Sequence, residues 1–113
     1  MLTIEALNGF GANTKEGLTR CMNNEVFYLR LVGKGIKDPS FEKLADAVAA
    51  GDKKAGFEAA HALKGICANL SLTPLTKPVS EVTELFRSGA DADYNKYLEE
   101  ILSLRAKLAA LCE

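Results

Sequence analysis

The sequence lacks several features that mark well-known classes of protein. It has no tryptophan, one histidine and three prolines in 113 residues. No apolar run approaches the about 18 residues that span a membrane. The N-terminus, Met-Leu-Thr-Ile-Glu, has neither the basic start nor the long apolar stretch of a signal peptide. We therefore expect a protein without a membrane segment or a leader, located in the cytoplasm.

Cysteine and excess charge are also scarce. An odd, widely spaced set of Cys21, Cys67 and Cys112 fits neither a disulfide framework nor a Cys-x-x-Cys metal site. The set predicts free thiols in a reducing compartment. A formal net charge of −1 lacks the basic excess that is typical of proteins that bind nucleic acid. A single histidine, His61, excludes most sites in which several histidines bind a metal.

What the sequence does contain is a series of amphipathic segments separated by short breaks, with almost no strand pattern. The last four segments are joined by links of a few residues, which predicts that neighbours run antiparallel. We expect an all-α fold: an antiparallel, up-and-down four-helix bundle formed by residues 25–112, with short N-terminal helices covering one end. Helices are expected over about 3–9, 14–22, 25–33, 41–50, 53–70, 74–88 and 94–112.

The apolar positions of these segments predict the core. In the segment that carries the histidine, the predicted buried stripe is Ala59, Ala62, Leu63, Ile66, Cys67 and Leu70. Across the bundle, we expect the core to include Phe27, Leu44, Val48, Leu63, Ile66, Leu70, Val82, Phe86, Leu98 and Ile101.

His61 lies off this stripe. At about 100° per residue, Leu63 is about 200° around the helix from His61, so the imidazole is expected to point to solvent. Its own face holds Phe57 and Glu58 one turn before it, and Lys64 and Gly65 one turn after it. Glycine inside a helix costs about 1 kcal/mol relative to alanine, and here the missing side chain opens space beside the imidazole.

These residue types fit one chemistry. An exposed imidazole is mostly neutral near pH 7 and is a good nucleophile toward an activated phosphoryl group. Lys64 supplies positive charge for the phosphoryl oxygens, and Gly65 lets the active site of a partner come close. Phosphoryl transfer requires mainly positioning and electrostatic stabilisation, and two proteins can share that task.

Residues 60–70, Ala-His-Ala-Leu-Lys-Gly-Ile-Cys-Ala-Asn-Leu, resemble the signature of histidine-containing phosphotransfer (HPt) domains. That family has an apolar residue, a lysine and a glycine at the second, third and fourth positions after the histidine, and small residues near the seventh. The similarity extends over nearly the whole chain, through residues 17–29, Asp52 and Leu75. One departure is Ser71, where the family often has glycine. Serine resists a left-handed conformation, so the sequence does not determine the conformation of the turn before Thr73.

The resemblance implies a single HPt domain over residues 1–113 that acts as a phosphocarrier. Such a domain accepts a phosphoryl group on the histidine, here His61, from a receiver-domain aspartate of a hybrid sensor kinase or a response regulator, and passes it to another receiver. It needs no cofactor and has no nucleotide site of its own, in keeping with the absence of a Gly-rich phosphate loop. Met1 and the complete bundle favour a free-standing protein, and the use of every apolar stripe in the core favours a monomer.

Two other functions stay open at this point. The chain could be a helical adaptor without chemistry, in which His61 is incidental. A metal or cofactor bundle is disfavoured, because such sites recruit ligands from several helices and this chain has one histidine, in the single Glu-x-x-His motif of Glu58 and His61. Exposure of His61 among small residues would favour the phosphocarrier, and burial of His61 would favour the adaptor.

Overall fold

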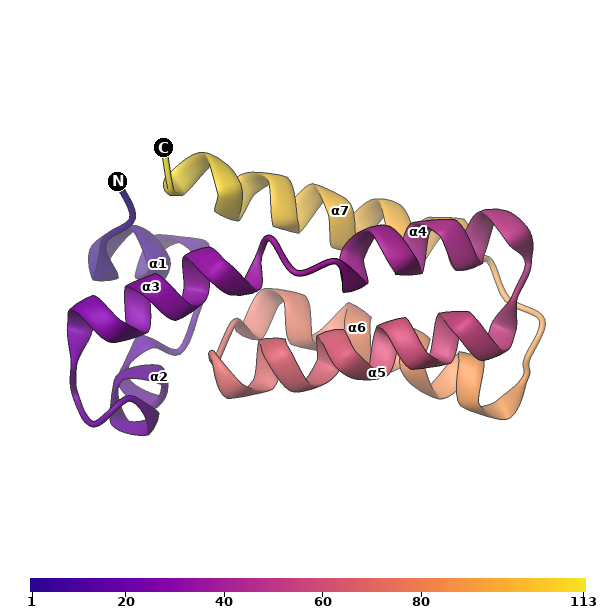
Figure 1. Cartoon of the computed structure of the whole chain (residues 1–113), viewed down its shortest axis with the longest axis horizontal. Coiled ribbons are helices and arrows are strands. Elements are labelled where there is room, and N and C mark those ends of the chain that lie inside the picture. The colour runs from indigo at the N-terminus through magenta and orange to yellow at the C-terminus, as the bar shows by residue number, and fades with distance from the viewer.

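The computed structural model describes residues 1–113 and contains seven helices and no strand, which confirms the all-helical prediction (Figure 1). None of these helices is both long enough and apolar enough to cross a membrane. The helices are α1 (Ile4–Phe10), α2 (Thr14–Arg20), α3 (Glu25–Gly35), α4 (Ser40–Ala50), α5 (Lys53–Asn69), α6 (Thr73–Ser88) and α7 (Tyr94–Leu111).

Short polar and glycine caps set where the long helices begin and end. Gly51 adopts a left-handed conformation, with φ of +67°, and ends α4. Asp52 follows at once, and its carboxylate accepts a hydrogen bond of 3.0 Å from the Ala55 backbone N–H, which begins α5. Gly89 ends α6 in the same left-handed region, and Asp93 caps α7. These caps keep the links short, so that each helix packs against the one before it.

The four C-terminal helices supply most of the core residues. Helix α5 packs against α4 and α6, and α7 packs against α6 and α4. Figure 1 shows α1, α2 and α3 gathered at one end, with α3 leading into α4 along the same direction. Arg105 of α7 secures the junction between α3 and α4, since its Nε donates to the Ile36 carbonyl at 2.6 Å and its guanidinium pairs with Glu42 at 3.0 Å.

The N-terminal helices are tied to the end of α5 through Tyr28 and Ser71. The Tyr28 hydroxyl donates to the Leu70 carbonyl at 2.8 Å, and its ring lies against Gly17. Ser71 has φ of +56°, the left-handed conformation that serine was expected to resist. Its hydroxyl donates to Glu16 at 3.0 Å, and its carbonyl accepts from the Asn13 backbone N–H at 2.9 Å. These two hydrogen bonds offset the strain of the turn.

The prediction that Phe27 lies in the core is wrong. Phe27 is 45% exposed, whereas its neighbour Tyr28 is fully buried. Tyrosine is buried here because its ring fills the space left by Gly17 and its hydroxyl finds a carbonyl partner. The other predicted core residues are buried, or half-buried and packed against the core; they are Leu44, Val48, Leu63, Ile66, Leu70, Val82, Phe86, Leu98 and Ile101.

The buried stripe of α5 is rotated slightly from the prediction. Ala62 is exposed, and Ala60 is fully buried in its place. Gly56 is also buried on this side of α5, where the Phe86 ring of α6 occupies the space that a side chain would fill: a Cβ there would lie 2.4 Å from the ring. His61 remains on the outer face of the helix.

Leu63 is the large side chain at the centre of this stripe, and it is fully buried. We expect Leu63→Ala to lower the free energy of unfolding by about 2–5 kcal/mol, because it removes buried apolar contacts and leaves a cavity. Ile66→Ala, three residues on at a half-buried position, is the matched control and should lose less. Urea denaturation measures both. A loss below about 0.5 kcal/mol for Leu63→Ala would contradict the assigned helix phase.

Candidate functional site

His61 lies at the middle of α5 with its side chain exposed. The imidazole is stacked on the ring of Phe57, one turn earlier on the same helix, with ring centroids 5.5 Å apart and planes inclined by 16°. The Arg87 guanidinium of α6 lies over the Phe57 ring, 5.0 Å from its centroid, and pairs with Glu84 at 3.2 Å. An exposed imidazole therefore rests on a ring that a second helix also contacts.

The other two predicted site residues lie one turn after His61. Lys64 is half-buried, and its ammonium has no carboxylate within ion-pair distance. Gly65 is exposed, and a Cβ added there would meet no other atom within 4 Å. The backbone of α5 thus holds His61, Lys64 and Gly65 together on its outer face, beside open space, as the spacing predicted.

Helix periodicity places Phe57 on the face of His61 without indicating a role for it, and no sequence pattern singles out Arg87. The stacking of Phe57 on His61 follows from a separation of four residues on one helix, so the sequence carried a signal for it. Arg87 is 26 residues from His61 in sequence, and only the packing of α6 on α5 brings it to Phe57.

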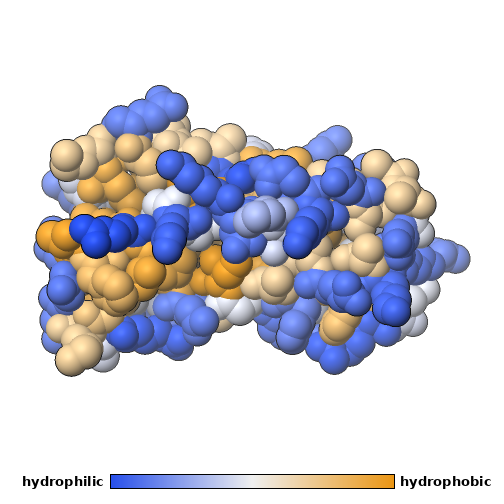
Figure 2. Space-filling model, in the orientation of Figure 1, coloured by the Kyte–Doolittle hydropathy of each residue, from blue (hydrophilic) through white to orange (hydrophobic).

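A hollow with an apolar lining lies toward the C-terminal end of α5. It has a volume of about 550 Å³ between α3 and the end of α5, with Leu31, Ile66 and Leu70 as its apolar lining and Lys34 and Lys37 among its polar residues. Figure 2 shows hydrophobic side chains gathered over α3 and its junction with α5, and hydrophilic side chains over much of α4.

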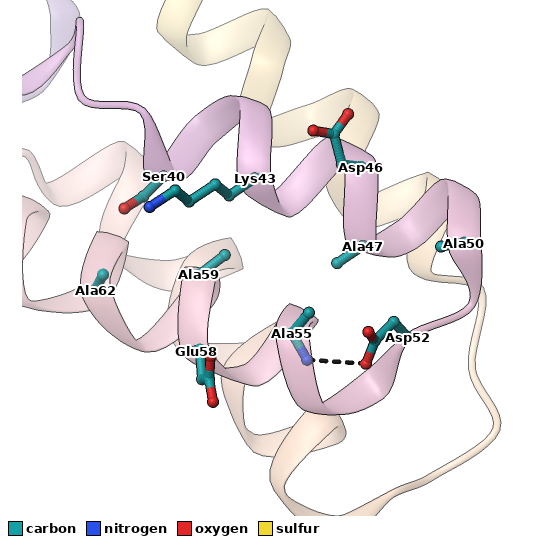
Figure 3. A pocket seen from close by; sticks show the side chains of 10 residues that line it. All are labelled: Ser40, Lys43, Asp46, Ala47, Ala50, Asp52, Ala55, Glu58, Ala59 and Ala62. Atoms are coloured by element: carbon teal, nitrogen blue, oxygen red, sulfur yellow. Dashed lines mark hydrogen bonds between the residues drawn. The ribbon is translucent and has the colours of Figure 1, made fainter.

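A second hollow, between α4 and α5, does not include the histidine. Its volume is about 470 Å³, and small side chains such as Ala47, Ala55 and Ala59 form its floor (Figure 3). Lys43 of α4 and Glu58 of α5 lie at its sides. With charges of both signs and shallow alanine walls, this hollow offers no convergent set of groups for a ligand.

The three cysteines are free thiols, and Cys21 and Cys67 are buried. Cys67 lies on the core side of α5, as expected of a small apolar residue. Burial raises the pKa of the Cys67 thiol to about 12. Across the chain, no three side chains of His, Cys, Asp or Glu lie close enough together to hold a metal ion.

The raised pKa of Cys67 makes stability depend on alkaline pH. The pKa of the Cys67 thiol is higher in the folded than in the unfolded protein. Its contribution to the free energy of unfolding is therefore complete below about pH 8.5 and declines as the pH rises toward 12. Between pH 8 and pH 10, we expect Cys67 to account for about 1–2 kcal/mol of lost stability. Urea denaturation at both pH values should show a smaller decline for Cys67→Ala than for the parent chain. Equal declines in the two proteins would contradict the assignment of this pH dependence to Cys67.

Comparison with known proteins gives one match. The model of the family described as Hpt domain matches residues 38–113, which cover α4 to α7 and include His61, Lys64 and Gly65. No curated protein and no solved structure matches the chain. The matched segment is about two thirds of the chain and contains the helix that holds the exposed histidine. The chain belongs to the Hpt domain family.

Proposed function

We propose that this protein is a phosphocarrier in which His61 accepts a phosphoryl group from the aspartate of one receiver domain and passes it to the aspartate of another. Hpt domains are phosphotransfer modules of phosphorelays, in which they interact with receiver domains. The exposure of His61 at the middle of α5 is the observation that carries the proposal. This placement favours a phosphocarrier over an adaptor with an incidental histidine.

The proposed reaction needs few groups. The unprotonated imidazole nitrogen, Nε2, attacks the phosphorus of the receiver's aspartyl phosphate. An N–P bond forms as the bond between phosphorus and the aspartyl oxygen breaks, and the aspartate leaves as a carboxylate. The other ring nitrogen keeps its proton, so the phosphorylated ring carries the positive charge until it loses that proton or the phosphoryl group moves on. Transfer to the second receiver is the same step in reverse.

Lys64 and Gly65 have separate roles in this proposal. The Lys64 ammonium stabilises negative charge on the phosphoryl oxygens from one turn away on the helix. Gly65 leaves the space beside His61 open, so that the acidic active site of the receiver can approach. The hollow lined by Leu31, Ile66 and Leu70, farther toward the C-terminal end of α5, offers the receiver an apolar surface to bury.

The proposal includes the organisation of the whole protein. We propose a single domain over residues 1–113, with α4 to α7 as an antiparallel, up-and-down four-helix bundle and the N-terminal helices covering one end. The contacts that join α4, α5, α6 and α7 support this arrangement. The protein is proposed to be a cytoplasmic monomer that has no nucleotide site and receives its phosphoryl group from a hybrid sensor kinase or regulator.

A relay assay tests the function. A panel of purified receiver domains is charged with radiolabelled acetyl phosphate, freed of donor and mixed with the protein. We expect label to move onto the protein and then onto a second, uncharged receiver domain that gains none when the protein is omitted. An adaptor would bind receivers without becoming labelled. Labelling from ATP alone would contradict the proposal in a different way, by showing a nucleotide site.

Lys64→Ala tests the electrostatic role of that residue. We expect transfer to slow about tenfold while binding of the receiver is retained. This is less than the about 10²–10³-fold cost of losing a donor in a water-excluded site, because Lys64 is only half-buried and solvent screens its charge. Raised salt should reproduce part of the effect on the parent chain, since exposed charges are screened over about 10 Å at 0.1 M ionic strength. Lys107→Ala, an equal charge change on the exposed face of α7, is the matched control. Equal slowing by both variants would show that only net charge matters.

A further inference from the structure

The imidazole of His61 does not stand alone on the surface of α5. It lies against the ring of Phe57, with centroids 5.5 Å apart and nearly parallel planes. Those values fall within the range of offset-stacked aromatic pairs, which are worth about 0.5–1.5 kcal/mol beyond their buried area. A stacked imidazole therefore has a preferred orientation, whereas an unsupported one samples several rotamers.

Phe57 is itself held by a group from another helix. The Arg87 guanidinium lies 5.0 Å from the centroid of the Phe57 ring, within the distance of a cation–π contact. Glu84, three residues before Arg87 on α6, pairs with that guanidinium at 3.2 Å. A chain of contacts thus runs from Glu84 through Arg87 and Phe57 to His61, and joins α6 to the exposed face of α5.

We infer that Phe57 is a positioning residue for phosphoryl transfer at His61, and that Arg87 fixes the Phe57 ring in place. The inference rests on the proposed function of His61 and adds a requirement to it. In-line attack needs the ring nitrogen aimed at the phosphorus, and small errors in aim slow a reaction steeply. Phe57 holds the imidazole in one orientation before the receiver binds. The His61 side chain therefore loses less conformational entropy when it reaches the reactive geometry.

Phe57→Leu is the test variant, because it keeps apolar volume and helix propensity but removes the aromatic face. We expect the transfer rate at saturating receiver to fall about threefold, since an unrestrained imidazole divides its time among staggered wells. The receiver concentration at half-saturation should not change. Phe57→Tyr keeps the ring and should restore the parent rate. Phe10→Leu is the matched control, as Phe10 is a half-buried phenylalanine on α1, which packs against α2 and α7.

A proton NMR spectrum of the unphosphorylated protein gives a second readout that does not depend on transfer. The chain has one histidine, so its imidazole resonances are unambiguous. Stacking on Phe57 should shift them upfield through the ring current. The shift should persist in Phe57→Tyr and Phe10→Leu and vanish in Phe57→Leu.

Three results would overturn the inference. An imidazole without a ring-current shift in the parent chain would mean that the rings do not stack. An unchanged rate at saturating receiver in Phe57→Leu, or an effect on half-saturation alone, would mean that stacking does not aid transfer. An equal loss of rate in Phe10→Leu would indicate general destabilisation. A failure of the proposed function would look different. Label on His61→Gln would contradict that function, but it would not change the ring-current shift that shows stacking in the parent chain.

Discussion

Replacing Gly65 should make the protein more stable and a poorer phosphocarrier. Glycine is about 1 kcal/mol worse than alanine inside a helix. A Cβ at position 65 would meet nothing within 4 Å, so no clash offsets the gain. We therefore expect Gly65→Ala to raise the free energy of unfolding by up to about 1 kcal/mol. Gly65→Gln should also be stable, but its side chain projects beside His61 and should slow transfer about tenfold or more by obstructing the receiver.

Gly33 provides the matched control for this prediction. It also lies within a helix, α3, and a Cβ there would likewise meet nothing within 4 Å. It lines a different part of the surface, with Leu2 and Cys112. Gly33→Ala and Gly33→Gln should therefore stabilise the protein without slowing transfer. Thermal melting and transfer rates on the four variants measure both effects. If Gly65→Gln transfers at the parent rate, Gly65 is not needed for access.

The sequence predicted helices well where the caps are local. Gly51 with Asp52, and Gly89 with Asp93, are short-range signals, and each marks a break between helices that the structure reproduces. The placement of His61 away from the core of α5 was equally predictable, because helix periodicity alone sets it. Lys64 and Gly65 follow from the same periodicity, since they lie three and four residues after the histidine.

The errors arise where tertiary contacts decide. Hydropathy favoured Phe27 over Tyr28 for the core, but the Tyr28 hydroxyl finds the Leu70 carbonyl, 42 residues away, and the ring fits against Gly17. Ser71 takes a left-handed conformation because Glu16 and Asn13 supply hydrogen-bond partners from the N-terminal region. No sequence pattern within α5 predicts contacts with these distant groups, and none predicts the position of Arg87.

Residues 1–37 lie outside the segment that matches the family, yet they are part of the packed core. Leu7, Tyr28 and Val32 are fully buried. Gly35 approaches Ile66 and Leu70 so closely that a Cβ there would lie 2.8 Å from the Leu70 side chain. The N-terminal helices therefore support the C-terminal end of α5, and α3 forms one wall of the hollow at that end.

The most direct test of the central claim is to charge the parent chain and His61→Gln side by side from a phosphorylated receiver domain. His61 is exposed and its main contact is the stack on Phe57, so His61→Gln should keep its circular dichroism spectrum and lose no more than about 0.5–1.5 kcal/mol of stability. We predict that the parent chain acquires label that is labile in acid and stable in base, as a phosphoramidate is, and that His61→Gln acquires none. Label that persists in folded His61→Gln, or label that resists acid, would place the phosphoryl group elsewhere and contradict the account.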